Sequence, residues 1–234
     1  MLTLHQRVGW LRHLGIACFQ QHHRELEPVF RPYVGAEAVV VDVGAHAGQF
    51  TKLFAGMAPQ GRVYAFEPSV YARSILKPAV AFNRLRNVEI VPTGLSDQPG
   101  QATLSTPVKE RGGFGFGLAS LAGVSGGRVR SDQTVELQTL DGFAQRADLK
   151  RLDFLKADVE GWEAHVLRGG AQTLRRFRPA LFLELSVEAL GRAGETAPPI
   201  WDLLGPMGYS ALKAPEFRSV AAFDGTSDYL FVAR

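Results

Sequence analysis

The stretch Ala38–Gly48 (AVVVDVGAHAG), followed by Arg62–Pro68 (RVYAFEP), decides the fold. Short runs of β-branched residues such as Val39–Val41 are typical of strands that are buried on both faces. The first run ends at Asp42, and after two glycines a helix is expected over residues 49–58. A strand, a glycine turn and a helix together form the geometry that holds a nucleotide-like ligand at a helix N-terminus.

The acid after the second strand has the position of a ribose-binding carboxylate. Glu67 follows Gly44 by 23 residues, and an acid about 20 residues past such a turn can hold two ribose hydroxyls. Gly44 and Gly48 give G-x-x-x-G, whereas dinucleotide folds use G-x-G-x-x-G, and the sequence contains no P-loop motif. Asp42 would repel a pyrophosphate, but it suits a ligand with a positive centre or an amino group. S-adenosylmethionine (SAM) has both, and a ribose; the alternative is a plain strand–helix turn whose glycines serve only the backbone.

Composition limits the class of protein. The chain has 234 residues, of which 46% are hydrophobic, which suits one α/β domain over residues 37–234 with an N-terminal helical cap over residues 1–36. No apolar stretch reaches the ~18 residues that span a bilayer, and the N-terminus lacks the apolar core of a secretory signal. The single cysteine, Cys18, excludes an internal disulfide and favours a reducing, cytoplasmic location. The net charge of +3 comes without a basic track, so no nucleic-acid partner is expected.

Strands and helices alternate along the rest of the chain, which predicts an α/β fold. Pro78 is expected to interrupt or shift one helix, and Gly169 with Gly170 to break another. Residues 101–104, after a turn at 97–100, are a candidate hairpin partner for the third strand. Strands are expected near residues 38–41, 62–66, 88–91, 135–140, 154–157, 180–185, 209–213 and 229–232, and helices near 4–30, 49–58, 71–83, 162–177 and 199–207.

A glycine-rich segment interrupts this alternation. Residues 112–127 hold seven glycines, with Phe114 and Phe116 among them. Glycine loses the most conformational entropy on ordering, so a regular element is not expected there. The segment is either a mobile lid that contacts substrate through its aromatic rings or a passive disordered insertion.

Three charged residues lie at the carboxyl end of the fourth core strand. Alternation places Lys156, Asp158 and Glu160 on one side if the strand runs that far. Ligands bind at this end of an open α/β sheet, and either acid could hold a substrate hydroxyl or take its proton. Lys156 is expected to pair with Glu184 on a neighbouring strand. The alternative is a structural salt-bridge network in which the acids, and Glu163 with them, complement a helix N-terminus.

Metal and nucleophile chemistry have little support in the sequence. His165 follows Glu160 by five residues, not by the three or four that place two ligands on one helix face. A serine nucleophile is not indicated either. No metal site is therefore predicted.

The chain resembles FkbM-type SAM-dependent methyltransferases over residues 37–234. The resemblance rests on Val41–Gly48, Phe66–Pro68, Thr139–Asp141 and Phe154–Glu163 (FLKADVEGWE), of which the last is the most specific. It implies the Rossmann-like, three-layer sandwich of class I methyltransferases. It also implies O-methylation of a hydroxyl on a small-molecule substrate, such as a sugar or another natural product.

The resemblance also assigns roles. The turn after the first strand cradles the methionine portion of SAM, the acid after the second holds the ribose, the exit of the third flanks the adenine, and the acids after the fourth face the reacting hydroxyl. The base is one of these acids or His46, and a homodimer stays open. The expected cofactor-binding residues are Asp42, Gly44, Ala45, His46, Gly48, Glu67, Pro68, Gly94 and Leu95, and the expected catalytic residues are Asp158 and Glu160.

Two other functions are compatible with this kind of fold. A nicotinamide-dependent oxidoreductase is disfavoured because G-x-G-x-x-G is missing. A non-catalytic SAM-binding module would be marked by loss of the acids at positions 158 and 160, and both are present.

Overall fold

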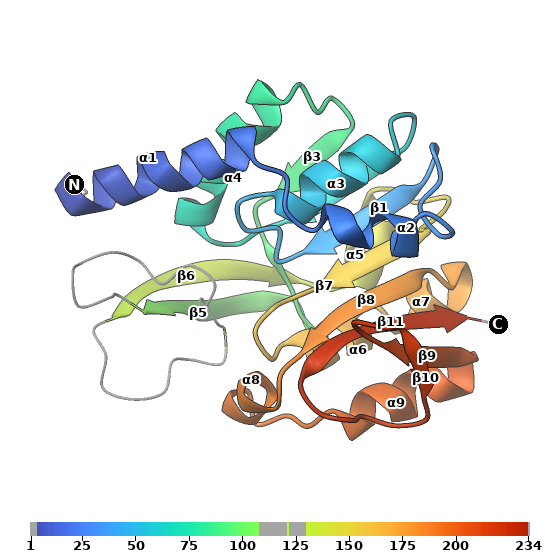
Figure 1. Ribbon diagram of the computed structural model, residues 1–234. Coiled ribbons are helices and arrows are strands. Elements are labelled where there is room, and N and C mark those ends of the chain that lie inside the picture. The colour runs from blue at the N-terminus through green and yellow to red at the C-terminus, as the bar shows by residue number, and fades with distance from the viewer. Residues whose placement is uncertain (1–3, 108–120, 122–129, 234) are drawn as a thin grey trace.

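The centre of the structure, a computed structural model that describes residues 4–107, 121 and 130–233, is an eight-stranded sheet (Figure 1). Its strands are β1 (Val39–Val43), β2 (Arg62–Phe66), β3 (Val88–Val91), β7 (Phe154–Ala157), β8 (Ala180–Leu185), β9 (Tyr209–Lys213), β10 (Arg218–Val220) and β11 (Ser227–Ala233). The order is β10-β9-β11-β8-β7-β1-β2-β3. The strands from β3 to β8 are parallel, and β11, β9 and β10 add antiparallel pairs at one edge.

Helices cover both faces of this sheet, which confirms the predicted three-layer α/β sandwich (Figure 1). On one face lie α2 (Glu27–Phe30), α3 (Gln49–Met57) and α4 (Val70–Phe82); on the other lie α5 (Leu140–Arg146), α6 (Glu163–Arg168), α7 (Ala171–Phe177) and α9 (Pro198–Leu204). Each face has its own apolar cluster. The short helix α8 (Val187–Arg192) follows β8.

Strand β1 shows why the sequence folds this way. Val41 and Val43 pack into the cluster beneath α5, and Val40 packs into the cluster beneath α3. Burying each of these side chains contributes roughly 1.5–3 kcal/mol. Asp42 alternates to the same side as Val40, where Thr51 of α3 donates a hydrogen bond to it at 2.6 Å.

A second, three-stranded sheet corrects the expected hairpin. It consists of β4 (Gly94–Leu95), β5 (Gly100–Pro107) and β6 (Arg130–Gln138), in the order β4-β6-β5. Residues 101–104 pair with β6, not with β3, because the β5–β6 register sets Leu104 opposite Gln133, far along the chain. Local sequence pattern does not encode such a distant register. The predicted lid over residues 112–127 lies outside the described residues, apart from Leu121.

Two helix expectations had different outcomes. The break at Gly169 and Gly170 is confirmed, since α6 ends at Arg168 and α7 begins at Ala171. A Cβ on Gly169 would lie 2.0 Å from the carbonyl oxygen of Ser96, so the chain needs glycine there. The expected interruption at Pro78 is wrong, because α4 continues through it. Packing of the buried face of α4 against the sheet outweighs the one helical hydrogen bond that proline removes.

The N-terminal segment packs as a cap on α3 and α4. Helix α1 (Leu4–Phe19) lies against α4, where Trp10 Nε1 donates a hydrogen bond to Ser74 Oγ at 2.8 Å. The chain leaving α1 is held by Lys52 of α3, whose Nζ donates to the carbonyl oxygens of Ala17 and Gln20 at 2.6 and 2.5 Å. The domain boundary at residue 36 stays a prediction. Within the described ranges, no helix has the length and apolar character to cross a membrane.

Candidate active site

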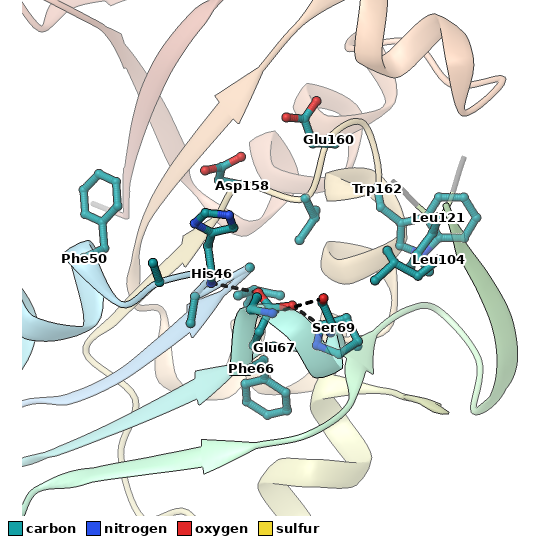
Figure 2. Close-up of a pocket in the computed structure, with 18 of the residues that line it drawn as sticks. His46, Phe50, Phe66, Glu67, Ser69, Leu104, Leu121, Asp158, Glu160 and Trp162 are labelled. Carbon is teal, nitrogen blue, oxygen red and sulfur yellow. Dashed lines mark hydrogen bonds between the residues drawn. The ribbon is translucent and has the colours of Figure 1, made fainter. Parts of the chain in front are cut away.

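A cavity of about 520 Å³ opens where β1, β2 and β7 end (Figure 2). The carboxyl ends of parallel strands are where α/β sheets bind ligands. The cavity brings together most of the predicted site residues, while Asp42 and Gly48 are absent from its lining. The predicted residues that do line it are Gly44, Ala45, His46, Glu67, Pro68, Gly94, Leu95, Asp158 and Glu160.

The turn after β1 requires both of its glycines. Gly44 has φ +75° and Gly48 has φ +86°, values that favour glycine. A Cβ on Gly44 would lie 2.0 Å from the carbonyl oxygen of Asp158, and one on Gly48 would lie 2.5 Å from Leu76 Cδ1. The first glycine therefore lets Asp158 approach the turn, and the second lets α3 pack against α4.

Asp42 is absent from the lining of the cavity, and its role in cofactor binding stays a prediction. Its side chain is fully buried and faces α3. Burial raises its pKa, while Lys156 and the Thr51 hydrogen bond oppose that shift. The Nζ of Lys156 is 3.6 Å from Asp42 Oδ1.

The expected ion pair between Lys156 and Glu184 is wrong. Lys156 Nζ lies 3.4 Å from Asp158 Oδ2, in addition to its contact with Asp42. The reason is register, because Asp42 on β1 is directly opposite Lys156 on β7, whereas the β8 residue opposite Lys156 is Phe182. Burial lowers the pKa of Lys156, but Asp158 and Asp42 outweigh it, so the net pKa is raised and the ammonium stays charged. Glu184 lines the cavity.

Glu67 is fixed at the end of β2 by backbone donors. The N–H of His46 donates to Oε2 at 2.7 Å and the N–H of Ser69 donates to Oε1 at 2.8 Å (Figure 2). Burial raises the pKa of Glu67 to about 7, against the opposing effect of these hydrogen bonds. Each carboxylate oxygen retains a further lone pair, so hydroxyl donors from the cavity can still bind.

His46 lies between Glu67 and Asp158 in the cavity (Figure 2). Its backbone is in the left-handed region, with φ 50°. Burial lowers its pKa to about 4, so the ring is neutral at neutral pH and is a weak proton acceptor. Asp158 and Glu160 face the same cavity and stay the predicted catalytic residues.

Asp158 and Glu160 reach the cavity from a turn, because β7 ends at Ala157 and the alternation predicted beyond it does not continue. Glu160 has φ 55° and its carboxylate is 3.2 Å from Arg192 Nη2. Burial, followed by the charge of Asp158, raises the pKa of Glu160 to about 6. Both acids nevertheless face the same cavity.

Glu163 holds this turn in place. Its Oε1 accepts hydrogen bonds from the N–H groups of Val159 and Gly161 at 3.1 and 3.2 Å. The side chain is 1% exposed, and burial raises its pKa to about 7. Glu163 therefore does more than complement the dipole of α6, since it fixes the backbone between the two candidate catalytic acids.

Glu163→Gln tests the electrostatic cost of this buried carboxylate. A folded-state pKa raised from 4.5 to about 7 means that stability is fully present below pH 4.5 and is lost as the pH rises through 7. The variant keeps Oε1 as an acceptor and removes the titration. The free energy of unfolding of the variant minus that of the parent is measured by urea denaturation at each pH. This difference is expected to be higher at pH 8 than at pH 5, by up to about 3 kcal/mol. An equal difference at both pH values would show that Glu163 does not titrate in this range.

Other walls of the cavity had no local signal in the sequence. His22 and His23 reach it from the cap, and the ring of His23 stacks on Phe50 of α3 with centroids 4.2 Å apart. Only the folding of the cap onto α3 places them there, so no motif could have identified them. Further lining residues are Ser69, Leu104, Thr106, Leu121, Ser131, Gln133 and Trp162.

His165 lies next to the cavity wall. Its ring stacks on Trp162 with centroids 3.8 Å apart, and its nitrogens are 3.0 and 3.1 Å from Asp97 and Glu195. Trp162 Nε1 in turn donates to Ser96 Oγ at 3.1 Å. Across the described part of the chain, no group of three or more His, Cys, Asp or Glu side chains could hold a metal ion.

Two curated proteins are similar to this chain. AmbE, an AMB antimetabolite synthetase of Pseudomonas aeruginosa, is 28% identical over an alignment of 222 positions that covers 82% of this chain but only 10% of AmbE. NoeI, a 2-O-methyltransferase of Sinorhizobium fredii, is 24% identical over 196 residues, covering 80% of this chain and 75% of NoeI.

Solved structures and a family model complete the comparison. A crystal structure described as methyltransferase FkbM from Methylobacillus flagellatus covers 85% of this chain and 44% of its own, at 14% identity and a TM-score of 0.52. SMU.1697c of Streptococcus mutans, solved in complex with S-adenosylhomocysteine (SAH), shares the fold at 10% identity and a TM-score of 0.51, over 91% of this chain and 97% of its own. The model described as "Methyltransferase FkbM domain" matches residues 42–211. The chain thus belongs to the FkbM methyltransferase family.

Proposed function

We propose that the protein transfers the methyl group of SAM to a hydroxyl oxygen of a sugar or another small natural product. The observation that carries this proposal is the pair of carboxylates, Asp158 and Glu160, that face the cavity beside the glycine turn. A hydroxyl acceptor has a proton to lose, and a positioned carboxylate can take it. The sugar as acceptor is supported by the similarity to NoeI, a 2-O-methyltransferase.

The residues of the cavity fit SAM. Its volume of about 520 Å³ lies within the ~300–1,000 Å³ of typical ligand pockets. We propose that the turn at Gly44–Gly48 holds the methionine portion, that Glu67 binds the ribose hydroxyls, and that Gly94 and Leu95 flank the adenine. The closeness of Gly44 to the backbone of Asp158 then sets the candidate base beside the methionine end.

The chemistry asked of the protein is limited. When bound, SAM supplies an activated methyl group on a sulfonium. The chain must align the acceptor oxygen and remove its proton. We assign proton removal to Asp158, because it faces the cavity and its backbone lies against Gly44 of the glycine turn. Glu160, held by Arg192, orients the acceptor.

Glu67→Ala tests the ribose site. Loss of a charged hydrogen-bond partner is expected to weaken SAH binding by roughly 1.5–3 kcal/mol in isothermal titration calorimetry. Glu89→Ala is the matched control, since Glu89 pairs with Arg62 on the exposed surface, away from the cavity. Unchanged SAH affinity in a folded Glu67→Ala protein would remove Glu67 from the cofactor site.

The proposal as a whole is tested by incubating the protein with SAM and a panel of hydroxyl-bearing acceptors. SAH release is followed, and the methylated atom is located by NMR. A methyl group on oxygen supports the proposal, and one found on nitrogen or carbon overturns it. Titration with NAD in the same calorimeter tests the oxidoreductase alternative.

Two finer expectations belong to this proposal. The single cysteine, Cys18, favours a reducing, cytoplasmic location. A homodimer stays a prediction, which sedimentation of the purified protein tests.

A further inference from the structure

An apolar patch lies exposed on α1 and α4, and none of its residues lines the cavity. Val8, Leu11 and Phe19 of α1 are 60%, 60% and 76% exposed, and Phe82 of α4 is 55% exposed. The rings of Phe19 and Phe82 meet edge to face, with centroids 4.9 Å apart. We call these four residues the docking face.

The helix spacing explains why the docking face lacks a partner within the described chain. Val8, Leu11 and Phe19 share one side of α1 because they recur three and eight residues apart. Trp10 and Ala17 lie on the opposite side and pack against α4. Helix α1 thus has two apolar sides, of which one is used by the fold and the other is exposed.

The charge around this face has one sign. Residues 1–24 and 68–88, which build α1 and α4, contain no Asp or Glu. They carry seven of the 26 Lys and Arg residues, so the rest of the chain is net negative. Exposed cations on these segments are Arg7, Arg12, Arg24, Lys77, Arg84 and Arg86.

We propose that the docking face binds an anionic membrane surface. Apolar side chains of an interfacial helix enter the boundary between headgroups and acyl chains, while arginines on its flanks bind lipid phosphates. Arg7 and Arg12 flank the apolar side of α1, which is the arrangement that such a surface requires. The proposal concerns a binding surface and does not depend on which acceptor the enzyme methylates.

Other occupants match the face less well. Two copies of this chain would bring two cationic surfaces together, and like charges repel. A nucleic acid would satisfy the cations but would leave four exposed apolar side chains against a polar backbone. An anionic bilayer satisfies both the charge and the apolar area.

Docking at this face also bears on the cavity. Phe19 is three residues before His22, which lines the cavity. A docked α1 would therefore hold the cap wall of the cavity close to the bilayer.

The test is flotation of the full chain with vesicles of equal parts phosphatidylglycerol and phosphatidylcholine, against vesicles of phosphatidylcholine alone. The protein is expected to float with the anionic vesicles only, and less at high salt. The double change Arg7→Glu and Arg12→Glu is expected to lower partitioning at least about 25-fold. The double change Leu11→Ser and Phe19→Ser is expected to lower it at least about 100-fold.

Matched controls carry the same changes elsewhere on the surface. Val187 on α8 is 58% exposed, so Val187→Ser controls for loss of an exposed apolar side chain. Arg218 on β10 is exposed, so Arg218→Glu controls for charge reversal. Both should float as the parent does.

Three results would overturn the proposal. The parent could stay unbound with anionic vesicles, bind neutral vesicles equally well, or keep its partitioning in the docking-face variants. A dimer that Leu11→Ser dissociates in sedimentation would assign the face to a second copy instead. Binding to duplex DNA that competes fully with the vesicles would assign it to nucleic acid.

Discussion

Asp158→Asn is expected to lower turnover roughly 10²- to 10⁴-fold, the usual contribution of a positioned general base. The asparagine keeps the size of the side chain but cannot take the proton of the acceptor. A larger loss is not expected, because alignment of the acceptor with the methyl group contributes much of the rate on its own. SAH affinity should remain close to that of the parent, which separates a loss of chemistry from a loss of cofactor binding.

The control for this change is Asp202→Asn, because Asp202 is an exposed residue of α9. The turnover of Glu160→Gln, compared with that of Asp158→Asn, shows how much each acid contributes to the rate. The pKa of Glu160 is raised to about 6, so any part of the rate that needs its ionised form falls as the pH drops through 6. If Asp158→Asn and Glu160→Gln both turn over within twofold of the parent, these acids are structural. The proton would then leave through His46 or directly to water.

Lys156→Ala is expected to destabilise the fold by about 3–5 kcal/mol, because it leaves a buried carboxylate without its cation. Asp42 is fully buried, and Lys156 is its nearest positive charge, at 3.6 Å. The measurement is the free energy of unfolding from urea denaturation at neutral pH. Lys150→Ala is the matched control; Lys150 pairs with Asp148 in solvent, and its loss should cost at most about 1 kcal/mol.

A second variant keeps this prediction testable if Lys156→Ala fails to fold. Lys156→Met combined with Asp42→Asn removes both charges, so it should be more stable than Lys156→Ala alone. A Lys156→Ala protein of parental stability that has lost all turnover would contradict the structural role. Lys156 would then be a catalytic residue.

Local patterns accounted for the elements whose cause is local. The apolar run before Asp42 predicts a strand buried on both faces, and Val40 and Val41 do pack into opposite layers. Gly169 with Gly170 predicted the break between α6 and α7. Pro78 shows the limit of such rules, since packing of α4 against α1 and the sheet keeps that helix continuous.

The candidate site divides in the same way. The sequence by itself determined the glycine turn, Glu67 and the two acids after the fourth strand, because each follows directly from a strand end. Only the tertiary structure decided that Lys156 pairs with Asp42 and Asp158, since strand register sets those neighbours. It alone also placed His23 against Phe50 and paired β5 with β6. These contacts join residues far apart in the chain, and the free energy that selects them comes from packing and charge burial that no local pattern records.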